Sequence, residues 1–448
     1  MSGVCLSKKD LTDGLAAAGV SLPVSEDGDG GEGILSESFS AGGLKIPNRL
    51  VCQPMEGCDG NFDGTPGELT LRRYLRLAGG GAGLVWFEAT AVLPEGRANP
   101  RQLMINKDNA GEFARAVELI KETAIKKNGY VPAVVMQATH SGRYSRPNGF
   151  PEPLIAINSP LLEGDRPVSA DRIVTDGYLD SVRDALVEGA RLAERAGFDG
   201  VDIKCCHRYL ASELLSAWGR PGRYGGSFEN RTRLVRESAA GAAEVCGSGF
   251  TVASRFNVYD GYPYPLGFGV SPDGGTEPDY SEGKALASML FEAGVRLFDV
   301  TMGNPYFNPH VNRPFARGGY EAPEPPLRGV ARILEGAKEI RSALPEGTGV
   351  VCSGLTFLGI EAPRVAAACV AEGWFDMAGF GREVLAYPDF AADILAGRGF
   401  DRRKICVACS KCTEIMRTPG GTPGCAVRDP LYTDLYRKIF GGKKTDGE

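Results

Sequence analysis

Eight short apolar runs recur along the chain, and helical patterns lie between most of them. The runs are RLVCQPM (49–55), GLVWFEATAV (83–92), VPAVVMQATH (131–140), FDGVDIKCC (198–206), FTVASRFNV (250–258), VRLFDVTMG (295–303), TGVVCSGLTF (348–357) and FDMAGFGRE (375–383). Strands that are apolar on both faces and separated by helices form a parallel sheet covered on its outside. The count of eight therefore predicts a closed (β/α)8 TIM barrel, with an open parallel sheet as the alternative.

The chain is long enough for such a barrel, and its composition indicates the class of protein. A TIM barrel commonly takes about 250 residues, so a chain of 448 residues is either one enlarged domain or two. Hydrophobic residues make up 43% and charged residues 24%, the balance of a soluble globular protein. The N-terminal stretch has acids and lysines where a signal peptide needs an apolar run, and no segment is long enough to span a membrane. We expect a cytoplasmic protein without a membrane partner. The net charge of −6, with no basic block, argues against nucleic acid.

Four of the twelve cysteines lie close together near the C-terminal end, at Cys406, Cys409, Cys412 and Cys425. In a large chain without an export signal thiols stay reduced, so metal or redox chemistry explains them better than disulfides. The C-x2-C-x2-C-x12-C spacing favours a [4Fe-4S] cluster, since three close thiolates can bind three irons and a remote fourth completes the site. Zinc and unligated thiols are the alternatives, although zinc more often uses two separated C-x2-C pairs.

The three histidines give an independent test of where the chemistry lies. His140, His207 and His310 each stand at or just beyond the end of an apolar run. Any one of them could be an ordinary packed or exposed histidine. The active sites of TIM barrels lie at the carboxyl ends of the strands. The position of all three histidines at or beyond such ends therefore favours a shared site. The long Gly/Pro/Tyr-rich loop at 259–283 has no helical or strand pattern, which is typical of a functional loop.

Several motifs resemble the old yellow enzyme family of FMN-dependent ene-reductases, in family order from about residue 36 to 395. The motifs are RLVCQPMEG, AGGGAGLVWFEATAV, MQATHSGRY, FDGVDIKCCHRYLASELLSAWGRPGRYGGSFENRTRLVRE, SRFNVYDG and GFGRE. With the cysteines, the chain is similar to the branch that contains 2,4-dienoyl-CoA reductase and trimethylamine dehydrogenase. The Gly/Asp-rich stretch SEDGDGGEG at 25–33 indicates a flexible lead-in at 1–35. The resemblance implies an FMN-binding TIM barrel at 36–395 and a short [4Fe-4S] segment with the tail at 396–448.

The resemblance also implies where FMN would bind. It places Pro54, Met55 and Glu56 along the ring, Ala89 and Gln137 at its pyrimidine edge, Arg255 beside N1, and Gly354, Leu355, Gly381 and Arg382 at the phosphate. A fixed positive charge at Arg255 would stabilise the anionic reduced flavin. The family usually has threonine or cysteine near the position of Glu56, so the tuning of the flavin there departs from the family pattern.

Substrate chemistry is expected in the KCCHRYL motif. By resemblance, Lys204 and His207 would bind the carbonyl oxygen of the substrate and Tyr209 would protonate carbon. Arg208 stands where the family has glycine, and with Lys204 it fits a substrate with negative charge, such as a carboxylate or a thioester with phosphates. The alternative is that Lys204 and Arg208 turn away into salt bridges. The remaining residues expected to reach this pocket, from the sixth run, are Tyr306 and His310.

The resemblance predicts an enzyme that reduces an activated C=C bond of an enoate, enoyl thioester or enone. Hydride would pass from flavin N5 to the β-carbon, and Tyr209 would supply the proton to the α-carbon. Electrons would enter through the cluster from another protein, or from NAD(P)H docked over the FMN. Two alternatives stay open: oxidation of an amine with electrons leaving through the cluster, and a non-catalytic zinc-bearing or electron-relay subunit. Whether the chain forms a homo-oligomer is also left open.

Overall fold

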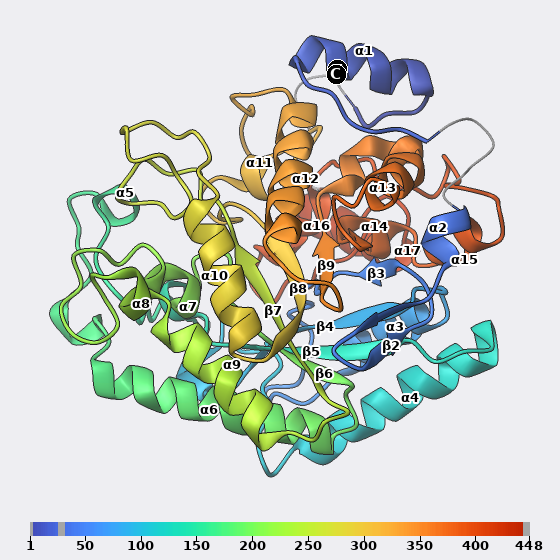
Figure 1. The fold of residues 1–448 in the computed structure, drawn as a ribbon. Helices are drawn as coiled ribbons and strands as arrows, with labels where there is room; N and C mark the ends of the chain where they lie inside the picture. The colour runs from blue at the N-terminus through green and yellow to red at the C-terminus, as the bar shows by residue number, and fades with distance from the viewer. Residues whose placement is uncertain (1–2, 26–31, 442–448) are drawn as a thin grey trace.

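Eight parallel strands close into a barrel in the computed structural model, which describes residues 3–25 and 32–441 (Figure 1). The strands are β3 (Leu50–Cys52), β4 (Leu84–Ala91), β5 (Ala133–Thr139), β6 (Gly200–Ile203), β7 (Thr251–Asn257), β8 (Val295–Thr301), β9 (Gly349–Cys352) and β10 (Met377–Phe380). They neighbour one another in chain order, and β10 pairs with β3 to complete the ring. Each falls within one of the eight apolar runs, and the predicted TIM barrel is confirmed.

Helices surround the barrel because each has an apolar stripe that needs a covered surface. The longer ones are α3 (Glu68–Ala78), α4 (Ala110–Asn128), α6 (Asp176–Arg195), α9 (Arg233–Val245), α10 (Ser281–Glu292), α12 (Pro326–Ser342) and α13 (Ala362–Ala371). Shorter pieces lie in the connections: α5 (Pro160–Glu163), α7 (Leu210–Leu214), α8 (Phe228–Arg231), α11 (Pro309–Asn312), α14 (Arg382–Ala386), and the 3-10 segments at Pro94–Gly96, Gly142–Tyr144, Ala170–Arg172 and Leu355–Glu361. In the described part of the chain, every helix is too short or too polar to cross a bilayer.

A β-hairpin lies at the amino ends of the barrel strands. Strands β1 (Phe39–Ala41) and β2 (Leu44–Ile46) pair in antiparallel fashion. The buried side chains of Leu44 and Ile46 share one apolar cluster with Val51, Leu84 and other residues from the beginnings of the barrel strands. The hairpin therefore covers the end of the barrel opposite the carboxyl ends of the strands, and these ends are left for the site.

The N-terminal lead-in is more ordered than its composition suggests. Residues Lys8–Ala18 form α1, which packs on α12, and Glu32–Ser36 form α2. Leu11 is buried, and the side chain of Arg328 on α12 donates to the carbonyl of Ala18 at 2.9 Å. The expectation of a flexible lead-in is thus wrong for α1, because its apolar face finds a partner on the barrel. Residues 26–31, the centre of the Gly/Asp-rich stretch, lie outside the described residues.

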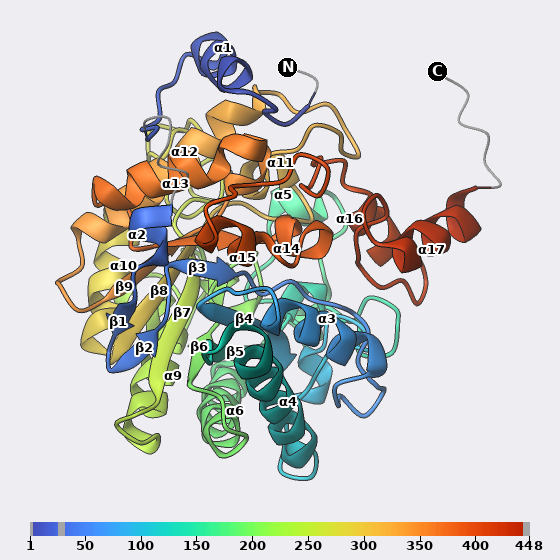
Figure 2. The same ribbon diagram turned by 90° about the vertical axis from the view of Figure 1, so that its right-hand side faces the viewer.

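The cysteine-bearing segment follows β10 and packs beside α3. It contains α15 (Phe390–Leu395), α16 (Lys411–Met416) and α17 (Pro430–Phe440), and Figure 2 shows α17 at the side of the barrel. Asp429 caps α17 by accepting from the backbone N–H of Leu431, and its carboxylate also accepts a bidentate pair of hydrogen bonds from Arg72 at 2.8 and 2.9 Å. Arg76 contacts the same carboxylate. One buried acid therefore anchors the segment to α3.

Replacing Asp429 with alanine should loosen this segment while the barrel stays folded. The change removes a helix cap worth about 1 kcal/mol and the anion that two arginines share. A loss of 1 to 2 kcal/mol corresponds to roughly 5- to 30-fold more frequent opening. We expect limited trypsin digestion to remove residues beyond 396 faster by about that factor.

Asp434→Ala is the matched control, since Asp434 lies on the same helix and is exposed. Arg72 and Arg76 lower the pKa of Asp429 against the opposing effect of burial. The anchoring is thus complete above about pH 4, the ordinary aspartate pKa, and is lost as pH falls through the lowered value. Equal cleavage rates for the two variants would contradict this role.

Candidate active site

One large cavity opens at the carboxyl ends of the barrel strands, with about 1160 Å³ of empty space including its mouth. Most of the residues predicted for FMN and substrate line it together. They are Pro54, Met55, Glu56, Ala89, Lys204, His207, Tyr209, Arg255, Tyr306, Gly354, Gly381 and Arg382. We call this cavity the barrel pocket. Four predicted residues are not among its lining residues: Gln137, Leu355, Arg208 and His310.

A layer of buried polar side chains lies inside the barrel among the strands that bear the pocket. Asp202 on β6 accepts from Gln137 at 2.7 Å and from the indole N–H of Trp86 at 3.0 Å. It also accepts from the backbone N–H of Arg255 at 2.7 Å. Gln137 is therefore held in the barrel interior by Asp202, which explains why it does not line the pocket. Sequence reasoning missed Asp202, although an acid inside an apolar strand was a visible signal.

Arg255 reaches the pocket from β7 and is held by a second buried acid. Its Nε lies 3.0 Å from Oδ2 of Asp299 on β8, and Asp299 also accepts from Gln53 at 3.0 Å. Burial raises the pKa of Asp299 to about 7, against the opposing effect of Arg255. The pair fixes the guanidinium at the pocket wall and compensates part of its charge. Asp299 and Gln53 were also missed by the sequence reasoning.

The loop after β6 carries two predicted residues in a backbone conformation that residues other than glycine rarely adopt. His207 and Arg208 both have positive φ, at 65° and 58°. The backbone N–H of His207 donates to Asn257 at 3.2 Å, which helps to hold this strained turn. The side-chain amide nitrogen of Asn312 lies 3.2 Å from Nε2 of His207, and the same nitrogen donates to the carbonyl of Met302 at 2.9 Å. The imidazole ring is thus held beside the loop that follows β8.

Charge in the pocket keeps this histidine neutral. Burial lowers the pKa of His207 well below its ordinary value, and the neighbouring Arg255, Lys204 and Arg313 lower it further. Burial also lowers the pKa of Lys204, although Cys206 and Glu56 oppose this effect. The pocket thus offers a neutral N–H donor and an ammonium group whose charge an anionic ligand would stabilise.

Tyr209 lies at the centre of a group of polar and aromatic side chains. The ammonium of Lys204 lies 3.8 Å from the centre of its ring, a cation–π contact. Its hydroxyl lies 3.1 Å from the hydroxyl of Tyr306 and 3.4 Å from a carboxylate oxygen of Glu56. Tyr306 in turn stacks on Tyr144 at 3.9 Å. The structure therefore brings Lys204, His207 and Tyr209 of the motif to one pocket, together with Tyr306 from the loop after β8.

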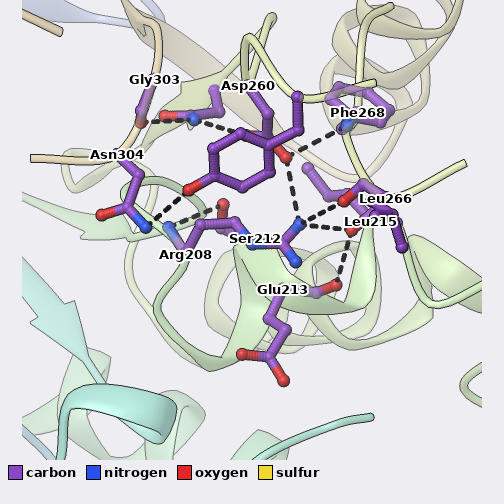
Figure 3. Close-up of polar contacts among 12 residues, drawn as sticks. Arg208, Ser212, Glu213, Leu215, Asp260, Leu266, Phe268, Gly303 and Asn304 are labelled. Atoms are coloured by element: carbon purple, nitrogen blue, oxygen red, sulfur yellow. Dashed lines mark hydrogen bonds and ion pairs between the residues drawn. The ribbon is translucent and has the colours of Figure 1, made fainter. Parts of the chain in front are cut away.

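Arg208 turns away from this pocket, which corrects its expected place among the substrate-binding residues. Its guanidinium is buried, lies 3.1 Å from Asp260, and donates to the carbonyl of Leu266 at 3.4 Å (Figure 3). Asp260 also accepts from Asn257 at 2.8 Å. A buried guanidinium needs such partners, so the salt-bridge alternative describes Arg208. The network connects the loops that follow β6 and β7.

His310 and Leu355 also lie outside the pocket lining. Nδ1 of His310 is 2.5 Å from the hydroxyl of Tyr320, which belongs to the loop between α11 and α12. The expectation that His310 reaches the substrate is not met, because this contact holds the ring outside the pocket. Leu355 is fully buried in the apolar core, so only its backbone could serve a ligand.

The end of the pocket near β9 and β10 has the features of a phosphate site. Gly354 lines the pocket with a φ of 89°, and a side chain there would collide with Ile333, so only glycine suits this turn. Nη1 of Arg382 and Nη1 of Arg313 are buried without a hydrogen-bond partner in the described residues. Two such nitrogens beside a glycine turn fit the FMN phosphate well. Arg313 was not predicted, although its place in the loop after the sixth run was a signal.

The four cysteines line a second, smaller cavity of about 330 Å³. Ala408 and Ser410, between the first three cysteines, have positive φ values of 51° and 60°, which bends the chain around the cavity. Backbone N–H groups donate to two of the sulfurs, from Ala408 to Cys406 at 3.4 Å and from Arg428 to Cys425 at 3.3 Å. Four cysteine sulfurs are the donor set that an iron-sulfur cluster uses, so the cluster, which stays a prediction, would bind in this cavity. Residues 3–25 and 32–441 contain no group of three or more His, Cys, Asp or Glu side chains placed for a single metal ion.

The two cavities adjoin. Arg382, Leu385 and Cys412 line both of them. Glu383, next to Arg382, accepts from the backbone N–H of Cys406 at 3.1 Å. The short helix α14 after β10 is therefore part of both sites.

Comparisons with known proteins agree with this geometry. The model of the NADH:flavin oxidoreductase / NADH oxidase family matches residues 35–268, just over half of the chain. An NADH oxidase of Thermoanaerobacter brockii is 29% identical over 383 residues, which are 82% of this chain but 52% of that protein. An NADPH dehydrogenase of Geobacillus sp. (strain WCH70) is 30% identical over 362 residues, 80% of this chain and 92% of that protein.

A solved 2-naphthoyl-CoA reductase complex superposes with a TM-score of 0.71 at 20% identity, over 90% of this chain and 58% of that one. This likeness shows the shared fold. The chain spans about half the length of the NADH oxidase and of the reductase. The predicted resemblance to the old yellow enzymes is confirmed, and with it a flavin-dependent oxidoreductase. The chain belongs to the NADH:flavin oxidoreductase / NADH oxidase family.

Proposed function

We propose that this chain is an FMN- and [4Fe-4S]-dependent ene-reductase whose substrate carries a carbonyl group and negative charge. The observation that carries the proposal is the set of groups at the pocket wall: Lys204, His207 and Arg255 beside the hydroxyl of Tyr209. Bound FMN would supply the hydride that adds to the β-carbon of the C=C bond. The residues that would hold it are Pro54, Met55 and Ala89 at the ring, Arg255 at its edge, and Gly354, Gly381, Arg382 and Arg313 at the phosphate.

The side chains around Tyr209 support a division of roles. His207, through the N–H of its neutral ring, and Lys204 would donate hydrogen bonds to the carbonyl oxygen and stabilise the enolate charge that develops there. Tyr209 would then transfer its phenolic proton to the α-carbon. His207 suits this role because it stays neutral and keeps its donor at ordinary pH. The left-handed turn and the bond to Asn257 hold the donor in place before substrate binds.

Charge weighs against the oxidation of an amine. A protonated amine would have to enter a pocket whose aromatic face already holds the ammonium of Lys204, 3.8 Å from the ring centre of Tyr209. Arg255, which also lines the pocket, adds to the repulsion. An enoate or an enoyl thioester with phosphates would instead be attracted by the ammonium of Lys204.

The cysteine segment at 396–448 supports electron entry beside the flavin. Cys406, Cys409, Cys412 and Cys425 would hold the cluster, and Cys412 also lines the barrel pocket. A cluster carries single electrons, so a separate electron-donor protein is the donor that it would serve. Direct reduction by NAD(P)H is the alternative that the family supports.

Tyr209→Phe tests the reaction itself. We expect reduction by dithionite and substrate binding to stay near wild type, while reoxidation of the reduced flavin by alkene slows by about 10²- to 10⁴-fold, the usual contribution of a general acid. The measurement is single-turnover oxidation of the reduced protein by enoates, enoyl thioesters, neutral enones and amines. If an amine reduces the oxidised flavin and no alkene reoxidises it, the proposed function is wrong.

Lys204→Met tests the charge of the substrate. A hydrogen bond to a charged group is worth about 1.5 to 3 kcal/mol, which corresponds to a loss of roughly 10- to 150-fold in kcat/KM for anionic acceptors. Neutral enones should lose far less. Lys284→Met, which removes a lysine of an exposed pair with Glu339 on the outer helices, is the matched control. Equal losses of kcat/KM for anionic and neutral acceptors would show that Lys204 does not distinguish acceptors by their charge.

Cys409→Ser tests the cluster. The variant should lose iron and keep FMN, because the phosphate and ring contacts come from the barrel. Iron, zinc and flavin analyses of the purified protein decide between a cluster and zinc. Reduction of the flavin by a one-electron donor protein should become slower, whereas reduction by NAD(P)H should not change.

Cys246→Ser, in the loop after α9, is the control for loss of a thiol away from the cavity. Zinc in the wild-type protein, or full iron in Cys409→Ser, would contradict the assignment.

A further inference from the structure

Glu56 is an acid in the barrel pocket to which the proposed reaction gives no role. It follows β3, and its carboxylate accepts from the hydroxyl of Tyr209 at 3.4 Å through one oxygen. The other oxygen accepts from the side-chain amide of Asn99 at 3.0 Å. The thiol of Cys58 lies 3.9 Å from that oxygen. Glu56 is therefore held in direct contact with the group that would protonate the substrate.

The groups that face Glu56 come from five segments of the chain. Tyr209 and Lys204 come from the β6 loop, Asn99 from the loop after β4, Cys58 from its own loop, Glu88 from β4 and Tyr306 from the loop after β8. Burial raises the pKa of Glu56, while Lys204, Tyr209, Asn99 and Cys58 act in the opposite direction. The net effect is an acid that holds its proton to higher pH than an exposed glutamate.

Tyr209 needs a source of protons after each turnover. Burial raises the pKa of Tyr209 well above its ordinary value, and Glu56 and Tyr306 raise it further. A tyrosinate left in this position is thus a strong base. Its hydroxyl contacts two groups that could return the proton, Glu56 and Tyr306. A carboxylic acid is normally more acidic than a phenol by about 6 pKa units. Transfer of a proton from Glu56 to the tyrosinate is therefore favourable.

We propose that Glu56 is the proton donor that reprotonates Tyr209 after Tyr209 has protonated the substrate. The inference rests on the proposed function. The O–H bond of Tyr209 breaks as a C–H bond forms at the α-carbon, while hydride from the reduced flavin completes the reduction. The O–H bond of Glu56 then breaks as that of Tyr209 forms again, and the carboxylate later takes a proton from water.

The resulting carboxylate is stabilised where it stands. Asn99 donates to it, and the ammonium of Lys204 compensates its charge. Glu56 is only partly buried, so water can reach it between turnovers. Glu56 acts through Tyr209 and makes no bond to the substrate in this scheme.

The test uses the FMN-loaded protein, reduced and mixed with one equivalent of a good acceptor, with tyrosinate followed by its ultraviolet difference absorption. In the wild type no tyrosinate should accumulate. In Glu56→Gln the first turnover should leave close to one tyrosinate per flavin, because the proton leaves Tyr209 and is not replaced. Later turnovers should slow by about 10²-fold or more. Glu56→Asp keeps an acid on a shorter side chain and should partly restore the reprotonation of Tyr209.

Tyr306→Phe is the matched control, because it removes the other hydroxyl in contact with Tyr209. Accumulation of tyrosinate in Tyr306→Phe and not in Glu56→Gln would show that Tyr306 reprotonates Tyr209, and it would overturn the inference. The double variant Glu56→Gln with Tyr209→Phe should give no tyrosinate signal. If Glu56→Gln matches the wild type while Tyr209→Phe is slow, the inference fails and the proposed function stands. If Tyr209→Phe runs at the wild-type rate, both fail.

A second measurement needs no turnover. Alkaline titration of the oxidised protein, with Tyr209→Phe as the blank, reports the ionisation of Tyr209 alone. Because the carboxylate of Glu56 raises the pKa of Tyr209, Glu56→Gln should shift this ionisation to lower pH. An unchanged titration in both Glu56→Gln and Glu56→Asp would show that the two groups do not interact and would overturn the inference.

Discussion

Positive charge gathered at the carboxyl ends of the barrel strands is the constraint that organises the rest of the site. Lys204, Arg255, Arg313 and Arg382 all line one pocket. Burying a cation costs several kcal/mol unless partners compensate it. Asp299 compensates Arg255, whereas Nη1 of Arg313 and of Arg382 have no partner among the described residues. A site built this way is most stable with anions in it. The phosphate of FMN and, in the proposed function, a negatively charged substrate would supply those anions at opposite ends of the pocket.

The strained loop after β6 fixes the positions of side chains in this charged site. His207 and Arg208 occupy the left-handed region, which persists only when surrounding contacts fix it. Asn257 provides one such contact, since it binds the backbone of His207, the carboxylate of Asp260 and the carbonyl of Gly303. The buried guanidinium of Arg208 therefore has a structural effect in place of the expected contact with substrate. It ties neighbouring loops together so that the donor of His207 is set before the reaction begins.

The sequence was sufficient for the barrel and for most of the pocket. The strands are mainly apolar, and parallel strands bring their carboxyl ends to one face, which predicts the barrel and the position of the site. The resemblance to a known family then placed residues such as Tyr209 and Arg255 in that site. The direction of a side chain could not be predicted in this way. Arg208 follows His207 directly, yet the backbone conformation turns it to Asp260 and away from the pocket.

Pairs formed across the barrel were also beyond sequence reasoning. Arg255 and Asp299 meet because the register of β7 and β8 sets them opposite each other, which no local pattern records. The register of β5 and β6 likewise sets Gln137 opposite Asp202, beneath the pocket.

The end of strand β10 explains why the cysteine segment belongs to this site. Immediately after it, Arg382 faces the barrel pocket and Glu383 accepts from the backbone of Cys406. A change that moved the cysteine loop would therefore also move the end of the barrel pocket beside Arg382. In the proposed function, this one short helix would constrain both electron entry and flavin binding, while Lys204, Tyr209 and Tyr306 would form a separate part of the pocket wall for the substrate.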